Sequence, residues 1–134
     1  MTNFLGITLS HDEILNLSST ALAHIGDAVF ELMVRGRLVK CGLCKASDLH
    51  RNTVLSVSAS AQAQAAETLS PHFTDEEMTV FRRARNAKVN SIPKHSDPAT
   101  YHAATAFEAL FGYLYLCGRH DRLNELFSII YPET

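Results

Sequence analysis

Two acidic residues, Asp27 and Glu108, lie in segments that are otherwise apolar. Asp27 directly follows Gly26. Both are poor helix formers, and together they destabilise a helix by roughly 1 kcal/mol or more relative to alanine. Glycine lets a second backbone or a ligand come close, and aspartate supplies a hard oxygen ligand. Asp27 is therefore a candidate for a chemical role.

Glu108 lies in the segment 103–116, where the other polar position is Thr105. A helix of this composition is expected to be buried, and a buried glutamate must be paired, protonated or bound to a metal. Two such carboxylates from two central helices could hold Mg²⁺ for phosphodiester hydrolysis. The spacing alone leaves a buried ion pair with an arginine equally open.

Two neighbours of Asp27 need separate interpretation. Glu31 lies one helical turn later and could share its face, although a solvated position is favoured by the spacing. His24 lies three residues before Asp27, and we interpret it as a packing or supporting histidine rather than a ligand.

The segment 81–95 carries cations and no acidic residue, although the whole chain has 12 Lys+Arg against 14 Asp+Glu and a net charge of −2. Such a segment could bind nucleic-acid phosphates. A solvated helix face is the interpretation that the charge run alone favours, and Arg85 and Asn86 could instead pair with buried groups. The cations are Arg82, Arg83, Arg85, Lys88 and Lys94.

The cysteines Cys41, Cys44 and Cys117 do not suggest a disulfide framework, because their number is odd. Cys41 and Cys44 form a CxxC motif, but no second pair of metal ligands stands at a suitable spacing. We interpret the motif as part of a loop around Gly42.

Hydrophobic spacing and capping signals predict helices along the whole chain and no strand. Ser10 with Glu13, Thr74 with Glu77, and Asp97 before Pro98 mark three helix starts. The expected helices span about 11–17, 19–40, 46–69, 75–88, 98–117 and 120–131, with a loop over 89–97. This predicts one all-α domain over residues 1–134.

The chain of 134 residues, 46% of them hydrophobic, has a globular composition. No apolar run reaches membrane-spanning length and no signal peptide is visible. We therefore expect a cytoplasmic protein without a membrane partner.

Several motifs resemble the ribonuclease III family. Ile25-Gly-Asp-Ala-Val-Phe-Glu-Leu32 resembles the signature helix of its catalytic domain, and Phe107-Glu-Ala-Leu-Phe-Gly-Tyr-Leu114 resembles the second acidic helix. The resemblance covers about residues 16–127 with its motifs in the same order, which is more specific than one short pattern. Further motifs resemble the Mini-ribonuclease III branch: Asp48-Leu-His-Arg51, Val57-Ser58, Ala61-Gln62-Ala63, Phe81-Arg-Arg-Ala-Arg-Asn-Ala-Lys88, Pro93-Lys94, Asp97-Pro98 and Thr100-Tyr101.

The resemblance implies a homodimeric helical bundle that cleaves double-stranded RNA with Mg²⁺, Asp27 and Glu108 being the catalytic and metal-binding residues. It implies no other cofactor, and it makes Arg82, Arg83, Arg85, Lys88 and Lys94 the candidate residues for binding double-stranded RNA, which is recognised mainly by shape. It also implies a role in maturing the 23S ribosomal RNA precursor, with a ribosomal subunit or a ribosomal protein as a further candidate partner. No separate RNA-binding domain is expected, as in the Mini branch.

Two positions depart from the larger ribonuclease III enzymes. Ala23 stands where those enzymes have glutamate, and Thr105 stands where they have aspartate. The Mini branch is similar in lacking both acids, so we expect one firmly held Mg²⁺, with further ions supplied by RNA phosphates. Ala84 stands where that branch usually has glycine, which could shift the turn.

Three other interpretations remain. A non-catalytic protein of the same fold that binds structured RNA or the ribosome is the main alternative. An HD-type phosphohydrolase is suggested by His120-Asp121, although Asp121 is explained by its place at a helix start. A helical adaptor is the third.

A homodimer would place two active sites at a fixed separation, as cutting both strands of a duplex requires. Leu22, Val29 and Phe30 form a candidate dimer contact. Packing within one subunit would produce the same pattern.

Overall fold

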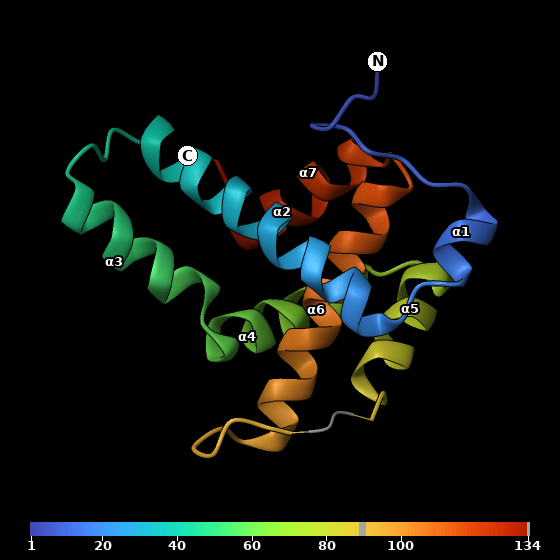
Figure 1. Cartoon of the computed structure of the whole chain (residues 1–134). Helices are drawn as coiled ribbons and strands as arrows, with labels where there is room; N and C mark the ends of the chain where they lie inside the picture. The colour runs from blue at the N-terminus through green and yellow to red at the C-terminus, as the bar shows by residue number, and fades with distance from the viewer. Residues whose placement is uncertain (89–90, 134) are drawn as a thin grey trace.

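The computed structural model describes residues 1–88 and 91–133, and this part of the chain is helical with no strand, as predicted (Figure 1). The helices are α1 (His11–Leu15), α2 (Ser19–Lys40), α3 (Ala46–Val57), α4 (Ala59–Leu69), the 3₁₀ turn η1 (Ser70–His72), α5 (Asp75–Arg85), α6 (Pro98–Leu116) and α7 (His120–Ile130).

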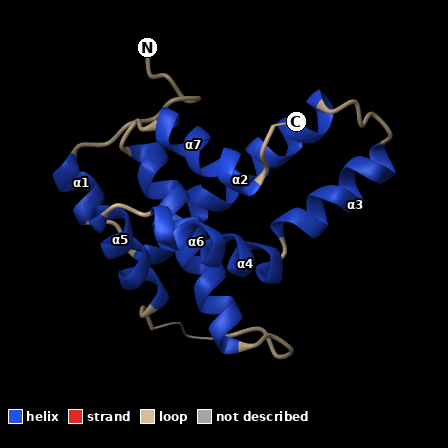
Figure 2. Cartoon of the chain, turned by 180° about the vertical axis from the view of Figure 1, so that it is seen from behind, coloured by secondary structure: helices blue, strands red, loops and turns tan. Residues whose placement is uncertain are grey.

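Helix α6 is the centre of the bundle because it is apolar on nearly every side. Phe107, Leu110, Phe111 and Leu114 on this helix are completely buried. Helix α2 crosses it, and α4, α5 and α7 pack around it, whereas α3 lies at the edge of the molecule in both views (Figure 1, Figure 2). One hydrophobic core therefore joins the helices.

The crossing of α2 and α6 is unusually close because a glycine stands on each helix. A Cβ at Gly26 would lie 1.6 Å from the carbonyl oxygen of Glu108, and one at Gly112 would lie 1.9 Å from the carbonyl oxygen of Leu22. Only glycine allows the two backbones to approach this closely. The sequence-based expectation that Gly26 permits a close backbone contact is confirmed.

Aromatic packing fixes the same pair of helices further along. The ring of Phe30 on α2 meets Phe107 and Phe111 on α6 edge-on, with centroid distances of 4.9 and 5.4 Å. Phe127 on α7 lies 6.0 Å from Phe30. Edge-to-face contacts of this kind contribute beyond the buried area.

The predicted helix over 46–69 is wrong in one respect, because it is two helices that meet at Ser58. The backbone of Ser58 is extended, and its side chain accepts a hydrogen bond from the amide of Ala61. A serine that satisfies the first free amides of a helix favours a new helix start. The alanine-rich sequence that follows Ser58 hid this break.

The other predicted helices lie within about three residues of their observed ends. Both capping boxes form, at Ser10 with Glu13 and at Thr74 with Glu77, and the Asp97 side chain caps α6. The predicted loop over 89–97 agrees with the non-helical residues 91–97, and its first two residues lie outside the described residues.

A buried ion pair joins α5 to α7. The carboxylate of Glu77, whose residue is 1% exposed, accepts hydrogen bonds of 2.8 and 2.9 Å from the Arg122 guanidinium. Burial alone would raise the pKa of Glu77, but Arg122 and Thr74 hold it below its ordinary value. Within the described part of the chain Arg85 forms no ion pair, unlike the alternative that the sequence left open, and its guanidinium lies 5.8 Å from the centre of the Phe81 ring.

The predicted dimer contact is wrong for two of its residues. Leu22 and Phe30 are 3% and 1% exposed and belong to the core of one subunit, and Val29 packs against that core. Packing within the subunit, the alternative reading, accounts for the apolar pattern. None of the described helices is both long and apolar enough to cross a membrane.

Candidate active site

Asp27 and Glu108 line one cleft of about 430 Å³. Helix α2 forms one wall and α6 forms the other, and the segment after α5 reaches the rim. The described residues around the cleft are Thr20, Ala23, His24, Asp27, Lys88, Ser91, Tyr101, Thr105 and Glu108.

The close crossing of the two helices positions these acids. Gly26 directly precedes Asp27, and its backbone contacts the backbone of Glu108 itself. Because the two backbones meet at this level, the carboxylates project from neighbouring helices into the same cleft. The sequence prediction that two central helices bring both acids together is confirmed.

The two carboxylates influence each other. Burial, followed by hydrogen bonding and charge repulsion from Asp27, raises the pKa of Glu108 to about 8. The Gln62 side chain on α4 acts in the opposite direction. Asp27 is exposed, and Glu108 is partly exposed rather than fully buried as the apolar sequence suggested. The pair is therefore accessible from solvent and carries an unbalanced negative charge when ionised.

No cation neutralises this pair within the described part of the chain. The ion pairs found there involve other carboxylates, those of Glu31, Asp48, Glu76, Glu77 and Glu125. The structural alternative of a buried ion pair thus applies to Glu77 and not to Glu108. Glu31 bonds Arg35 at 2.8 Å on the helix surface, in agreement with its predicted solvated position.

The donor set limits which metal could bind. Among the described residues, no group of three or more His, Cys, Asp or Glu side chains is arranged to hold an ion. Two carboxylates in an open cleft suit Mg²⁺, which keeps several of its waters and often binds through one or two protein carboxylates together with substrate phosphates. Zinc would require more nitrogen or sulfur ligands.

The predicted RNA-binding residues are all exposed, but they do not share one site. Lys88 lines the acidic cleft, whereas Arg82, Arg83 and Arg85 lie on α5. The Arg83 guanidinium donates a 3.3 Å hydrogen bond to the carbonyl oxygen of Leu17. Among these cations, Lys88 lines the cleft of the two carboxylates, whereas Arg83 and Arg85 line other hollows.

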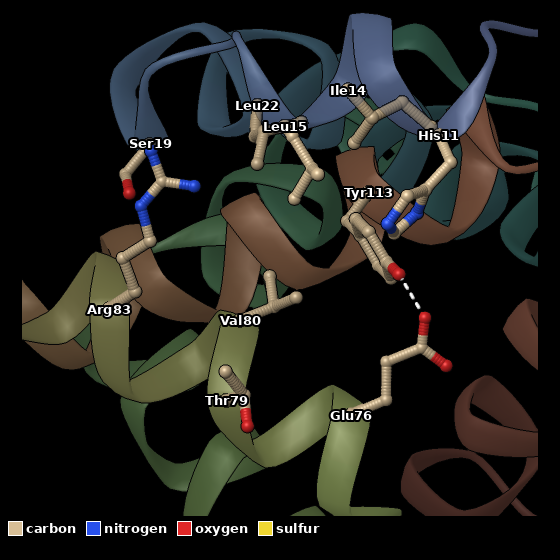
Figure 3. Close-up of a pocket in the computed structure, with 10 residues that line it drawn as sticks. All are labelled: His11, Ile14, Leu15, Ser19, Leu22, Glu76, Thr79, Val80, Arg83 and Tyr113. Atoms are coloured by element: carbon tan, nitrogen blue, oxygen red, sulfur yellow. Dashed lines mark hydrogen bonds between the residues drawn. The ribbon is translucent and has the colours of Figure 1, made fainter.

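A second hollow, of about 380 Å³, lies between α1, α2, α5 and α6 (Figure 3). Its walls are mainly apolar, with Ile14, Leu22 and Val80 among them. The Tyr113 hydroxyl donates a hydrogen bond to Glu76, which is also paired with Arg119 at 3.0 Å. Glu76, the acidic residue that lines this hollow, is thus already paired with a cation. Asp27 and Glu108 are not among the residues that line it.

The CxxC motif lies on the surface, with Cys41 and Cys44 both exposed. Neither cysteine belongs to a metal-binding group among the residues that the structure describes. Residues 41–45 form the turn between α2 and α3, with Gly42 at a positive φ of 96°, as the loop interpretation predicted.

Sequence reasoning missed three groups at or behind the cleft. Thr20 and Ser91 line it, and they gave no signal because a lone hydroxyl residue is common on helix surfaces and in loops. Gln62 is 2% exposed, and its side chain opposes the rise in the pKa of Glu108. A glutamine within an alanine-rich helix was the available signal.

Comparison with known proteins agrees with this geometry. The sequence profile of the ribonuclease III domain matches residues 20–119. Mini-ribonuclease 3 of Gloeobacter violaceus is 50% identical over 87% of this chain and 84% of its own length. Mini-ribonuclease 3 of Symbiobacterium thermophilum is 48% identical over 84% of this chain and 86% of its own length.

A crystal structure of a protein from Fusobacterium nucleatum has the same fold. Its TM-score is 0.80 at 24% identity, and the match covers 88% of this chain and 96% of that one. The sequence matches and the all-helical fold therefore agree: the chain belongs to the ribonuclease III family of endoribonucleases, in its Mini-ribonuclease III branch.

Proposed function

We propose that the protein is a Mg²⁺-dependent endoribonuclease that hydrolyses phosphodiester bonds in double-stranded RNA. The observation that carries this proposal is the convergence of Asp27 and Glu108 in an open cleft without a neutralising cation among the described residues. In this proposal both side chains are catalytic and each gives an oxygen to the ion.

The residues of the cleft have distinct tasks in this mechanism. A bound Mg²⁺ would lower the pKa of a water molecule and stabilise charge on the leaving oxygen. Glu108 must lose its proton to act as a ligand, because its pKa is about 8 in the free protein. Lys88 lines the same cleft and in this proposal would pair with the phosphate that is cut.

Duplex RNA would extend from the cleft over cations on α5 and the loop that follows. Arg82, Arg83, Arg85, Lys88 and Lys94 are exposed and would bind phosphates without reading bases. The net charge of −2 does not oppose this, because the cations are concentrated in one segment.

We further propose a homodimer, since one site cuts one strand. Large apolar side chains remain exposed at Leu32 and Val39 on α2 and at Val54 and Leu55 on α3. Helices α2 and α3 pack against each other, so a second copy of the protein could cover the exposed apolar side chains of both helices. Leu32→Asp should convert the dimer to a monomer in sedimentation experiments, whereas Leu15→Asp on α1 should not.

The proposed substrate is the 23S ribosomal RNA precursor in the cytoplasm, with a ribosomal subunit or a ribosomal protein as a possible partner. This part is supported by the similarity to Mini-ribonuclease 3 enzymes and the absence of a membrane-spanning helix in the described residues. The structure itself favours no RNA sequence.

Cleavage of a defined RNA duplex tests the activity. We expect cutting with Mg²⁺ and none with a chelator, and we expect Asp27→Asn to abolish cutting while RNA binding persists. If the wild-type protein bound the duplex and never cut it, the alternative of a non-catalytic protein that binds structured RNA would be correct.

A further inference from the structure

Gln62 on α4 has a feature that the fold does not explain. Its residue is 2% exposed, yet its amide nitrogen Nε2 has no hydrogen-bond partner. Among the described residues it is the only buried side-chain nitrogen or oxygen in this condition. Buried polar groups are nearly always paired, so an unpaired one needs an explanation.

The surroundings of Gln62 favour an apolar residue. The same helix buries Ala65, Ala66 and Leu69 against the core. A buried donor without a partner destabilises the folded state, whereas an apolar side chain of the same shape would not. Gln62 is therefore expected to lower the stability of the folded protein, so a role other than packing must account for it.

The Gln62 side chain acts on the Glu108 carboxyl group, although its Nε2 completes no hydrogen bond to it in this structure. Its effect on Glu108 is that of a hydrogen-bond donor, opposing the effects of burial and of Asp27. Helices α4 and α6 pack side by side, and Gln62 is buried in the bundle, whereas Asp27 lies on α2 and is exposed. Gln62 does not line the cleft and cannot touch RNA directly.

We propose that Gln62 is a positioning residue: when Glu108 is ionised and binds a metal ion, the free Gln62 Nε2–H donates a hydrogen bond to one carboxylate oxygen and leaves the other oxygen for the ion. This inference rests on the proposed role of Glu108 as a metal ligand. A carboxylate ligand is commonly oriented by a hydrogen bond to its second oxygen, and loss of such a partner typically lowers metal affinity or activity by about 10–100-fold.

The test compares Gln62→Met, which has nearly the same shape and no amide, with Gln64→Leu as a matched control. Gln64 lies on the same helix and is exposed. Mn²⁺ binding is measured by titration of the RNA-free protein, thermal unfolding is measured in chelator, and kcat and KM are measured on a duplex RNA.

For Gln62→Met we expect Mn²⁺ affinity and kcat to fall by about 10-fold or more, with KM for RNA unchanged. The melting temperature in chelator should stay the same or rise, because an unpaired buried amide is removed. The Gln64→Leu protein should match the wild type in all measurements. Gln62→Ala, which suits an alanine-rich helix, should show the same loss of Mn²⁺ affinity and replaces the methionine variant if that one does not fold.

Wild-type Mn²⁺ affinity in folded Gln62→Met or Gln62→Ala would overturn the positioning role and leave the proposed function intact. A lower melting temperature with unchanged Mn²⁺ affinity would assign Gln62 to the fold. A wild-type protein that binds no Mn²⁺ while Gln62→Met behaves identically would overturn both the proposed function and this inference.

Discussion

At the scale of single residues, the neighbouring carboxyl groups of Asp27 and Glu108 repel each other when both are ionised, and this works against the stability of the metal-free protein. Burial and the neighbouring carboxylate disfavour the ionised form of Glu108. Functional sites commonly retain such unfavourable groups because their chemistry requires them. The stability of the metal-free protein should therefore report on this pair.

Glu108→Gln should stabilise the protein in chelator at alkaline pH. The pKa of Glu108 is raised to about 8 in the folded state, so folding opposes its ionisation as the pH rises from its ordinary pKa through 8. We expect a gain of about 2 kcal/mol in the free energy of unfolding at pH 8.5, after allowance for solvent screening, and almost none near pH 4.5. Denaturant unfolding at both pH values measures this gain in unfolding free energy. An equal gain at both pH values would contradict the raised pKa of Glu108.

Arg122→Leu should destabilise the protein strongly at neutral pH, because Glu77 would stay buried without its partner. Loss of one partner of a buried pair costs about 3–5 kcal/mol. Because the pKa of Glu77 is lowered in the folded state, this loss should shrink as the pH falls below its ordinary pKa. Arg35→Ala, which breaks an exposed pair, should cost only about 0.5 kcal/mol. Similar losses in the two variants would contradict the burial of Glu77.

The sequence was sufficient to find Asp27 and Glu108 because each is a charge in an apolar helix. It could not pair Glu77 with Arg122, since 45 residues separate them and no local pattern links α5 to α7. Gln62 was hidden for the same reason, because its significance depends on which helix packs beside Glu108.

At the scale of helices, the contact of Gly26 with α6 determines whether the two acids meet. Gly26→Ala should force the helices apart, because the added Cβ would lie 1.6 Å from a backbone oxygen that cannot rotate away. We expect loss of most cleavage activity and a clear fall in melting temperature. Gly36→Ala is the matched control: it lies on the same helix with nothing within 4 Å of the added Cβ, and should stabilise by about 1 kcal/mol. A Gly26→Ala protein with wild-type stability would contradict the close crossing.

Helix positions were largely predictable, because spacing and capping residues are local signals. The end of α2 and the start of α6 follow from Gly42, Asp97 and Pro98. The break at Ser58 was not predicted, since serine also occurs inside helices and the alanines that follow it are good helix formers. Helices α3 and α4 run in different directions, so their packing favours a break at Ser58 over one continuous helix (Figure 1).

At the scale of the whole molecule, RNA binding should depend on salt through the cations of α5. We expect Arg82→Ala combined with Arg83→Ala to weaken duplex binding and to reduce the slope of log affinity against log salt by roughly one for each lost phosphate contact. Fluorescence anisotropy at several salt concentrations measures the slope. Arg51→Ala, on α3 and paired with Asp48, serves as the control. An unchanged slope in the double variant would place the RNA on another surface.

The central claim is that the carboxylates of Asp27 and Glu108 in one subunit bind a divalent ion together. Anomalous scattering from a crystal soaked in Mn²⁺ tests it most directly, with an Asp27→Asn crystal for comparison. The account predicts one strong peak between the two carboxylates in the wild type and its loss in the variant. A peak elsewhere, or cleavage-competent protein with no peak in the cleft, would contradict it.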